Sequence, residues 1–304
     1  MQFTTLKPEH FRLLRPFFEE QPHRLSVFSL PGIVCWRNVG GSSIRFGIED
    51  GTLLLTSRCP DRPEQNHLAL PLPWRGQGPE ELARLATRLD CSCFGYVPGD
   101  VMDAWDPSAV ERLFTVEHRP DFDDYVYSAS DLTTLPGRAF ASKRNLVRQF
   151  EREWSETDRV WTGPLSSGDR DECLRFLEDW HRARVESGGP DPGLDDELAA
   201  ARNAVLDTEA LEIEGLVLRL DGRVAGLGIA ARLTDGMGVL HVEKAEAAIT
   251  GLYQYLDRQV ARTLFLGRYP LINKESDLGQ PGLRKAKRSG HPVEMVRCFR
   301  LRLR

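Results

Sequence analysis

The spacing of apolar and polar residues predicts a mixture of helices and strands in the first part of the chain. Apolar side chains recur at helical spacing in three segments, at residues 8–18, 79–89 and 107–114. Three further segments are predicted as strands, at residues 27–36, 43–48 and 52–57. Glu49-Asp50-Gly51 provides a hairpin turn between the last two of these strands.

The second part of the chain, from Tyr125 onward, changes repeatedly between the helical and the strand period. Helices are predicted at residues 132–135 (capped by Asp131), 138–154, 169–185, 195–206, 251–265 and 282–289. Strands are predicted at residues 159–162, 214–220, 223–233, 238–243, 270–273 and 293–303. This order predicts an α/β fold with a mixed sheet and helices on both of its faces.

The length of 304 residues fits two domains of ordinary size. The change in pattern places the expected boundary after Asp124. We therefore predict one domain at residues 1–124 and a second at residues 125–304.

The net charge and its distribution along the chain limit the classes of function that the protein can have. The chain has 40 Lys and Arg against 45 Asp and Glu, and a net charge of −5, which excludes a generally basic nucleic-acid coat. The bases are nevertheless concentrated, with eleven bases against three acids in residues 262–304 and five against one in residues 138–152. Each stretch is either a solvated helix face or a local basic surface.

Several other classes are excluded by what the sequence lacks. No apolar run reaches the roughly 18–20 residues of a membrane span, and the first residues do not form a signal peptide, so we expect a cytoplasmic protein. The six cysteines form no CxxC pair and are expected to be thiols, and no metal site is predicted. The signatures GxxxxGK[ST], HExxH and GxSxG are absent.

The predicted strand at residues 238–243 leads through a loop to a helix that begins at Gly251. Free N–H groups and the helix dipole make such a turn a natural anion site. The layout is similar to that of GNAT acyltransferases, in which this turn holds a pyrophosphate. The glycine-rich Q/RxxGxG/A signature for acetyl-CoA is missing from this sequence.

A set of motifs in the second part points to a known family. They are Tyr127-Ser-Ala-Ser-Asp131-Leu, Leu135-Pro-Gly-Arg138 through Lys143-Arg144-Asn145, His241-Val-Glu243-Lys244-Ala, Gly251-Leu-Tyr253-Gln254, Ile272-Asn273-Lys-Glu275-Ser-Asp277-Leu-Gly279 and Gly282-Leu-Arg284-Lys285-Ala-Lys287-Arg-Ser289. These motifs resemble those of the DUF2156 family, which is related to the C-terminal domain of phosphatidylglycerol lysyltransferases. Two positions depart from the pattern. The common NRExDLG has Lys274 in place of Arg, and the common KLSY reads Lys287-Arg288-Ser289-Gly290, without the Tyr.

The resemblance implies two tandem GNAT-like acyltransferase domains, with the site in the second domain or between the two. It also implies an aminoacyl-tRNA donor, because the membrane relatives move an aminoacyl group from charged tRNA to a lipid head group. This chain shows no membrane domain, so the acceptor is left open between a small molecule, a peptide and a lipid head group.

Acyl transfer requires a base, a stabilised oxyanion and a proton for the leaving group. His241 and Glu243 lie two apart on one predicted strand and face the same side. We predict Glu243 as the general base, His241 as its orienter or an alternate base, and Tyr253 as the general acid. The alternative is that His241 and Glu243 pair structurally with Lys244 or a nearby Arg, and that Tyr253 is a buried core residue.

Asn273, Glu275 and Asp277 repeat the same two-residue spacing at a strand end. A free amino group on an aminoacyl ester needs a carboxylate of this kind. The alternative is structural pairing, with Asp277 as a cap and Glu275 bound to Arg284 or Lys285.

Basic residues on two predicted helices are candidates for a wall that binds the phosphates of tRNA or CoA, if the helices face one cleft. Asn145 is a candidate for holding a carbonyl. The predicted substrate-binding residues are Arg138, Lys143, Arg144, Asn145, Lys244, Asn273, Glu275, Asp277, Arg284, Lys285 and Lys287.

The sequence therefore predicts a GNAT-like acyl- or aminoacyltransferase, with charged tRNA as donor and an amine or hydroxyl as acceptor. Two alternatives stay open. One is an N-acyltransferase that uses acyl-CoA through a divergent phosphate loop. The other is a non-catalytic module that binds nucleic acid or another anion on the same fold.

Overall fold

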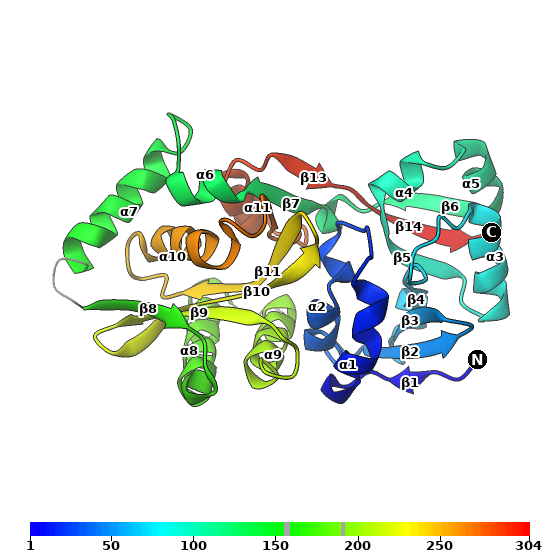
Figure 1. Ribbon diagram of the computed structural model, residues 1–304, viewed down its shortest axis with the longest axis horizontal. Coiled ribbons are helices and arrows are strands. Elements are labelled where there is room, and N and C mark those ends of the chain that lie inside the picture. The colour runs from blue at the N-terminus through cyan, green and yellow to red at the C-terminus, as the bar shows by residue number, and fades with distance from the viewer. Residues whose placement is uncertain (155–158, 190–191) are drawn as a thin grey trace.

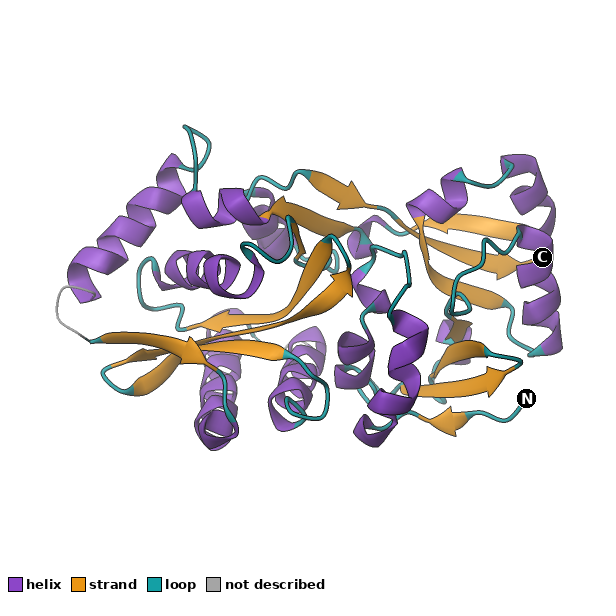
Figure 2. Cartoon of the chain, in the orientation of Figure 1, coloured by secondary structure: helices purple, strands orange, loops and turns teal. Residues whose placement is uncertain are grey.

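The computed structural model describes residues 1–154, 159–189 and 192–304, and it contains two seven-stranded mixed sheets that lie side by side (Figure 1). Helices cover both sheets, as the colouring by secondary structure shows (Figure 2). The predicted α/β class is confirmed.

The first sheet is built mainly from the N-terminal part of the chain. Its strand order is β1-β2-β3-β4-β5-β14-β6, antiparallel except for the β4–β5 pair. The strands are β1 (Thr4–Thr5), β2 (Ser43–Glu49), β3 (Thr52–Arg58), β4 (His67–Leu68), β5 (Cys93–Pro98), β6 (Phe114–His118) and β14 (Cys298–Leu303). The helices of this part are α1 (Phe11–Leu14), α2 (Leu30–Cys35), α3 (Pro79–Arg88), α4 (Gly99–Asp103) and α5 (Pro107–Leu113).

The second sheet has the order β13-β7-β12-β11-β10-β9-β8, in which only β11 and β12 are parallel. Its strands are β7 (Asp124–Ser128), β8 (Val160–Pro164), β9 (Glu214–Leu220), β10 (Arg223–Thr234), β11 (Met237–Ala245), β12 (Leu271–Asn273) and β13 (Glu294–Val296). The helices are α6 (Ala129–Thr134), α7 (Ala141–Trp154), α8 (Arg170–Gly188), α9 (Pro192–Leu206), α10 (Leu252–Val260), extended by a π-helical turn (Ala261–Phe265), and α11 (Pro281–Arg288).

Strand alternation distributes the apolar residues between the two faces of the second sheet. Leu216, Leu218 and Leu220 pack in a core with α6, α7 and α10, whereas Val217 packs in a core with α8 and α9. Figure 1 shows α8 and α9 on one side of this sheet and α6, α7 and α10 on the other. The core on the α8–α9 side continues into α1 and α2, so it joins the two halves of the molecule.

Residues 27–36 form a 3₁₀ turn and helix α2 rather than the predicted strand, so that prediction was wrong. Ser29 caps the helix, with its hydroxyl accepting from the N–H of Gly32, and Pro31 sets a helical φ in the first turn. Most residues of α2 are buried, so no polar face marks the helical period. The cap of α6 also differs, because Ser128 and not Asp131 accepts the hydrogen bond.

The predicted strand at residues 293–303 is two strands, and they belong to different sheets. β13 pairs with β7 in the second sheet, whereas β14 lies between β5 and β6 in the first. The chain enters the second sheet with β7, which begins at Asp124, and β14 is the segment that crosses back into the first sheet. The domain boundary after Asp124 stays a prediction.

Candidate functional site

A cavity of about 1130 Å³ lies between the two halves of the molecule. The first half contributes residues of α2 and β3 to its wall, and the second contributes β11, α9, α10, α11 and the segment after β12. Of the predicted site residues, seven line it: Lys143, His241, Glu243, Lys244, Tyr253, Glu275 and Lys287.

His241 connects the two halves at this cavity. Its Nδ1 lies 2.8 Å from a carboxylate oxygen of Glu275, and its Nε2 lies 2.8 Å from the hydroxyl of Ser29. In the ladder with β10, Leu240 and Val242 pair with successive residues, so His241 is the extra residue of a β-bulge. Bulges redirect side chains, and this one places the imidazole against α2.

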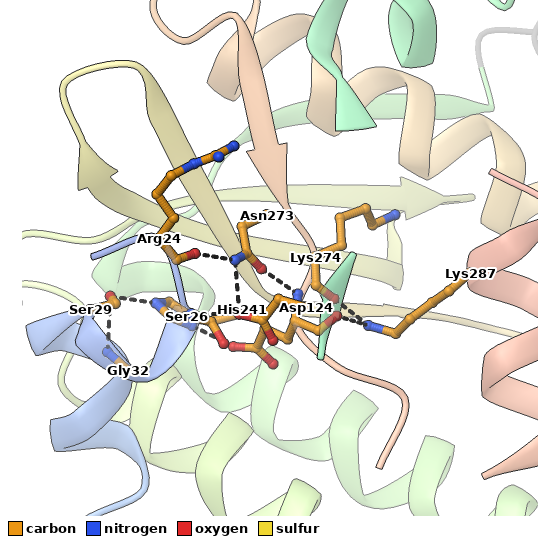
Figure 3. A network of polar contacts seen from close by, with 10 residues as sticks. Arg24, Ser26, Ser29, Gly32, Asp124, His241, Asn273, Lys274 and Lys287 are labelled. Carbon is orange, nitrogen blue, oxygen red and sulfur yellow. Dashed lines mark hydrogen bonds and ion pairs between the residues drawn. The ribbon is translucent and has the colours of Figure 1, made fainter. Parts of the chain in front are cut away.

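A network of hydrogen bonds around Asn273 fixes the backbone at Glu275. Figure 3 shows Asn273 with its partners Asp124 and Arg24. The amide of Asn273 donates to Asp124 and to the carbonyl of Arg24, each at 2.9 Å, and its oxygen accepts from the N–H of Glu275 at 2.7 Å. Glu275 has a φ of +60°, a strained conformation for a residue with a side chain. Burial raises the pKa of Asp124 to about 6. Asn273 therefore acts by holding Glu275, from outside the cavity.

Glu243 belongs to a chain of four charges that are largely shielded from solvent. The ammonium of Lys274 lies 2.5 Å from Glu243 and 2.9 Å from Asp257, and Asp257 is also 3.6 Å from Lys143. Burial raises the pKa of Glu243, although Lys274 opposes the shift. Burial also tends to raise the pKa of Asp257, but the nearby charges of Lys274 and Lys143 outweigh this effect, so the pKa of Asp257 is lowered. The two carboxylates thus differ in their affinity for a proton.

Lys287 is a lysine whose hydrogen bonds go to main-chain carbonyls. Its ammonium donates to the carbonyl of Lys274 and, at 3.1 Å, to that of Glu275. No carboxylate among the described residues forms an ion pair with it. Burial lowers the pKa of Lys287 to about 8, so this amine is partly neutral near physiological pH.

Tyr253 and Lys244 meet at Trp180. The indole N–H donates to the Tyr253 hydroxyl at 2.8 Å, and the Lys244 ammonium lies 4.2 Å from the indole ring centre. Lys244 is also paired with Glu197. Burial raises the pKa of Tyr253, so its hydroxyl keeps its proton at neutral pH.

The other predicted site residues lie outside the cavity. Asp277 is bound by the guanidinium of Arg284 at 2.9 and 3.0 Å and by the hydroxyl of Tyr125 at 2.6 Å. Although burial opposes the change, these donors lower the pKa of Asp277 to about 2. Arg284 binds Asp121 as well, so its charge is neutralised within the protein.

Of the predicted basic wall, only Lys143 and Lys287 line the cavity. Arg144 donates to the carbonyls of Leu135 and Gly137 and so closes the end of α6. Arg138, Asn145 and Lys285 are exposed on the surface.

The predicted anion turn before α10 is covered by α7. Gly251 has a φ of +82°, and a Cβ there would overlap the carbonyl of Leu146. Glu246, an acid, lies within the turn. The turn is therefore built for close packing between α7 and α10.

Sequence reasoning missed four groups of the candidate site: Ser29, Asp124, Asp257 and Lys274. Ser29 is hidden in a segment that was predicted as a strand. Asp257 could have been noticed as a carboxylate on the apolar side of α10, where it is buried with Leu256 and Val260.

No cluster of metal-ligating side chains is found within residues 1–154, 159–189 and 192–304, and the six cysteines are buried thiols. None of the helices in these ranges combines the length and the apolar composition needed to cross a bilayer.

Several solved structures are similar to this protein over most of its length. A conserved protein from Bacteroides thetaiotaomicron is 24% identical, with all of both chains covered and a TM-score of 0.86. The C-terminal DUF2156 domain of a putative lysylphosphatidylglycerol synthetase from Agrobacterium fabrum is 12% identical, with 90% of this chain and 86% of that chain covered and a TM-score of 0.60. A tandem GNAT protein from the clavulanic acid biosynthesis pathway is 12% identical, with 99% and 98% covered and a TM-score of 0.48.

None of the curated proteins matches this sequence. The family model described as "Phosphatidylglycerol lysyltransferase, C-terminal" matches residues 80–302, which is more than half of the chain. The resemblance seen in the motifs is thereby confirmed, and the chain belongs to the family of phosphatidylglycerol lysyltransferase C-terminal domains.

Proposed function

We propose that this protein is a GNAT-like acyltransferase that moves an aminoacyl group from charged tRNA to an amine or hydroxyl acceptor bound in the cavity. The observation that carries the proposal is the pair of carboxylates with opposite pKa shifts, Glu243 and Asp257, which line one cavity together with Glu275 in a chain of this family.

Glu243 serves as the general base. Pairs of titratable groups with opposite pKa shifts reveal which one exchanges protons. Asp257 is paired with both Lys143 and Lys274, so it stays ionised and holds Lys274 in place. Glu243 is paired with Lys274 alone, and its pKa is raised. Glu243 therefore takes the proton of the acceptor as the acceptor attacks the ester carbonyl.

Glu275 and Tyr253 act at the donor. One oxygen of Glu275 accepts from His241, and the side chain is 28% exposed, so the other oxygen is available to the ammonium of an aminoacyl group. When the ester C–O bond breaks, the ribose oxygen of the tRNA takes the proton of Tyr253. The indole of Trp180 donates to that phenol, so the phenol proton remains free for this transfer.

The distribution of bases favours tRNA over CoA as donor. Of the lysines that line the cavity, Lys143, Lys244 and Lys274 have carboxylate partners and Lys287 donates to main-chain carbonyls. The glycine-rich phosphate signature is missing. Outside the cavity, Arg138, Arg148, Arg152 and Lys285 are exposed and form no ion pair with any described residue. Exposed bases without carboxylate partners suit a large polyanion.

The direct test uses tRNA charged with labelled amino acids and a panel of amine, peptide and lipid head-group acceptors. The proposal predicts transfer of label to an acceptor. If no label is transferred and the protein does not bind tRNA at low salt, charged tRNA is not the donor. Stabilisation by CoA in a thermal-shift assay would favour the acyl-CoA alternative.

A non-catalytic binding module is the alternative from another class, and Glu243→Gln separates the two. In an enzyme this change stops turnover and leaves ligand binding intact. In a module it leaves the protein unaffected or weakens binding.

A further inference from the structure

We propose that Ser29, on helix α2 of the first half, is a positioning residue that sets the protonation pattern of the His241–Glu275 pair. The inference rests on the proposed function, because Glu275 is the carboxylate assigned there to the ammonium of the aminoacyl group. It adds that the first half of the molecule supplies a working part of the site.

The three side chains form a relay that opens to the cavity at one end. Ser29 is 1% exposed, the side chain of His241 is 5% exposed and that of Glu275 is 28% exposed. The contacts along the relay are 2.8 Å each. Because Ser29 is covered, it does not meet a substrate, and its influence passes through the imidazole.

The hydrogen bonds determine where the protons lie. The hydroxyl oxygen of Ser29 accepts from the N–H of Gly32 at 3.4 Å, which leaves its own proton free to be donated to Nε2 of His241 at 2.8 Å. A neutral imidazole has one N–H, and with Nε2 as acceptor that N–H is at Nδ1. Nδ1 then donates to Glu275, which remains a carboxylate. The opposite tautomer would require a protonated Glu275.

The backbones of α2 and β11 both have features that allow the contact between Ser29 and His241. A Cβ at position 32 would lie 2.6 Å from Cε1 of His241, so the ring fits only against a glycine. His241 itself is the bulged residue of β11. A glycine on α2 and a bulge on β11 thus bring together two residues that are 212 positions apart in the sequence.

The first measurement is the tautomer of His241, read by ¹⁵N NMR of the full chain labelled at its seven histidines. A His241→Gln spectrum identifies the signal. Wild type is expected to show the Nδ1–H tautomer, with Nε2 as a hydrogen-bond acceptor. In Ser29→Ala the Nε2 signal should shift, and in Ser29→Thr, which keeps the hydroxyl, it should return toward wild type.

The second measurement is transfer kinetics with the matched control Ser128→Ala. Ser128 caps α6, another six-residue helix, through the N–H of Asp131, and it forms no hydrogen bond with a histidine in the described part of the chain. Ser29→Ala should lower kcat about tenfold, as expected for one buried hydrogen bond, while Ser128→Ala leaves kcat and the His241 spectrum unchanged.

An Nε2–H tautomer in wild type, or an unchanged His241 spectrum in Ser29→Ala, would overturn the relay. The NMR result needs no turnover, so it decides the relay even if charged tRNA proves not to be the donor. A fall in kcat shared equally by Ser128→Ala would show a structural role and would also overturn the proposal.

Discussion

Glu243 and Asp257 lie on different elements, β11 and α10, yet both bind the ammonium group of Lys274. All three side chains are at most 16% exposed. The ammonium of Lys274 therefore allows the two carboxylates to lie close together in a site that is largely shielded from water.

Replacing Lys274 by Met should destabilise the protein strongly. Removing one partner of a buried ion pair typically costs about 3–5 kcal/mol, because the remaining charge is uncompensated. Lys274→Arg is the matched control, since it keeps the cation and restores the residue common in the family motif. Urea unfolding should show the large loss only for Met, and equal stability of the two variants would argue against the cluster.

The two carboxylates should respond differently to neutralisation. Glu243→Gln removes the proposed base and should lower kcat by about 10²-fold or more, with little change in KM. Asp257→Asn leaves Lys143 and Lys274 with one carboxylate fewer, so its larger effect should be on the melting temperature. A Glu243→Gln enzyme with wild-type kcat would show that the base lies elsewhere.

Lys287 should give the protein an unusual dependence on alkaline pH. Its pKa of about 8 lies below the ordinary 10.5, so between these values the unfolded chain binds more protons than the native one. Stability then rises with pH across this window. Relative to Lys287→Met, wild type should gain free energy of unfolding from pH 8 to 10, and parallel curves would contradict the assignment.

Charge reversal on α7 should affect donor binding rather than chemistry. Arg148→Glu is expected to raise KM for charged tRNA several-fold and to reduce the salt dependence of binding, because fewer counterions are released. Arg84→Glu, an exposed base on α3, is the control and should behave as wild type. Equal effects of the two substitutions would indicate a response to net charge alone.

Local signals made much of the fold predictable from sequence. The β2–β3 hairpin was predictable from the turn between its strands. The starts of α3 and α5 were predictable from a proline in the first turn of each helix. Helix α2 was missed because it is buried on nearly every side, and β14 was assigned to the wrong sheet because its partners, β5 and β6, are distant in the chain.

Residues of the candidate site could be predicted where they lie in a local sequence motif. His241, Glu243 and Glu275 lie at motif positions, and all three line the cavity. Ser29 and Asp257 could not be assigned, because their roles come from contacts with segments far away in the sequence. The basic residues were recognised, but sequence does not show that Arg284 would be neutralised by Asp277 and Asp121.

The most direct measurement of the central claim is a single-turnover reaction of the purified protein with tRNA that carries a labelled aminoacyl group. Wild type should discharge the tRNA and deliver the label to an acceptor, whereas Glu243→Gln should bind the same tRNA and leave the ester intact. Equal discharge by both proteins, or none by wild type with every charged tRNA and acceptor, would contradict the account.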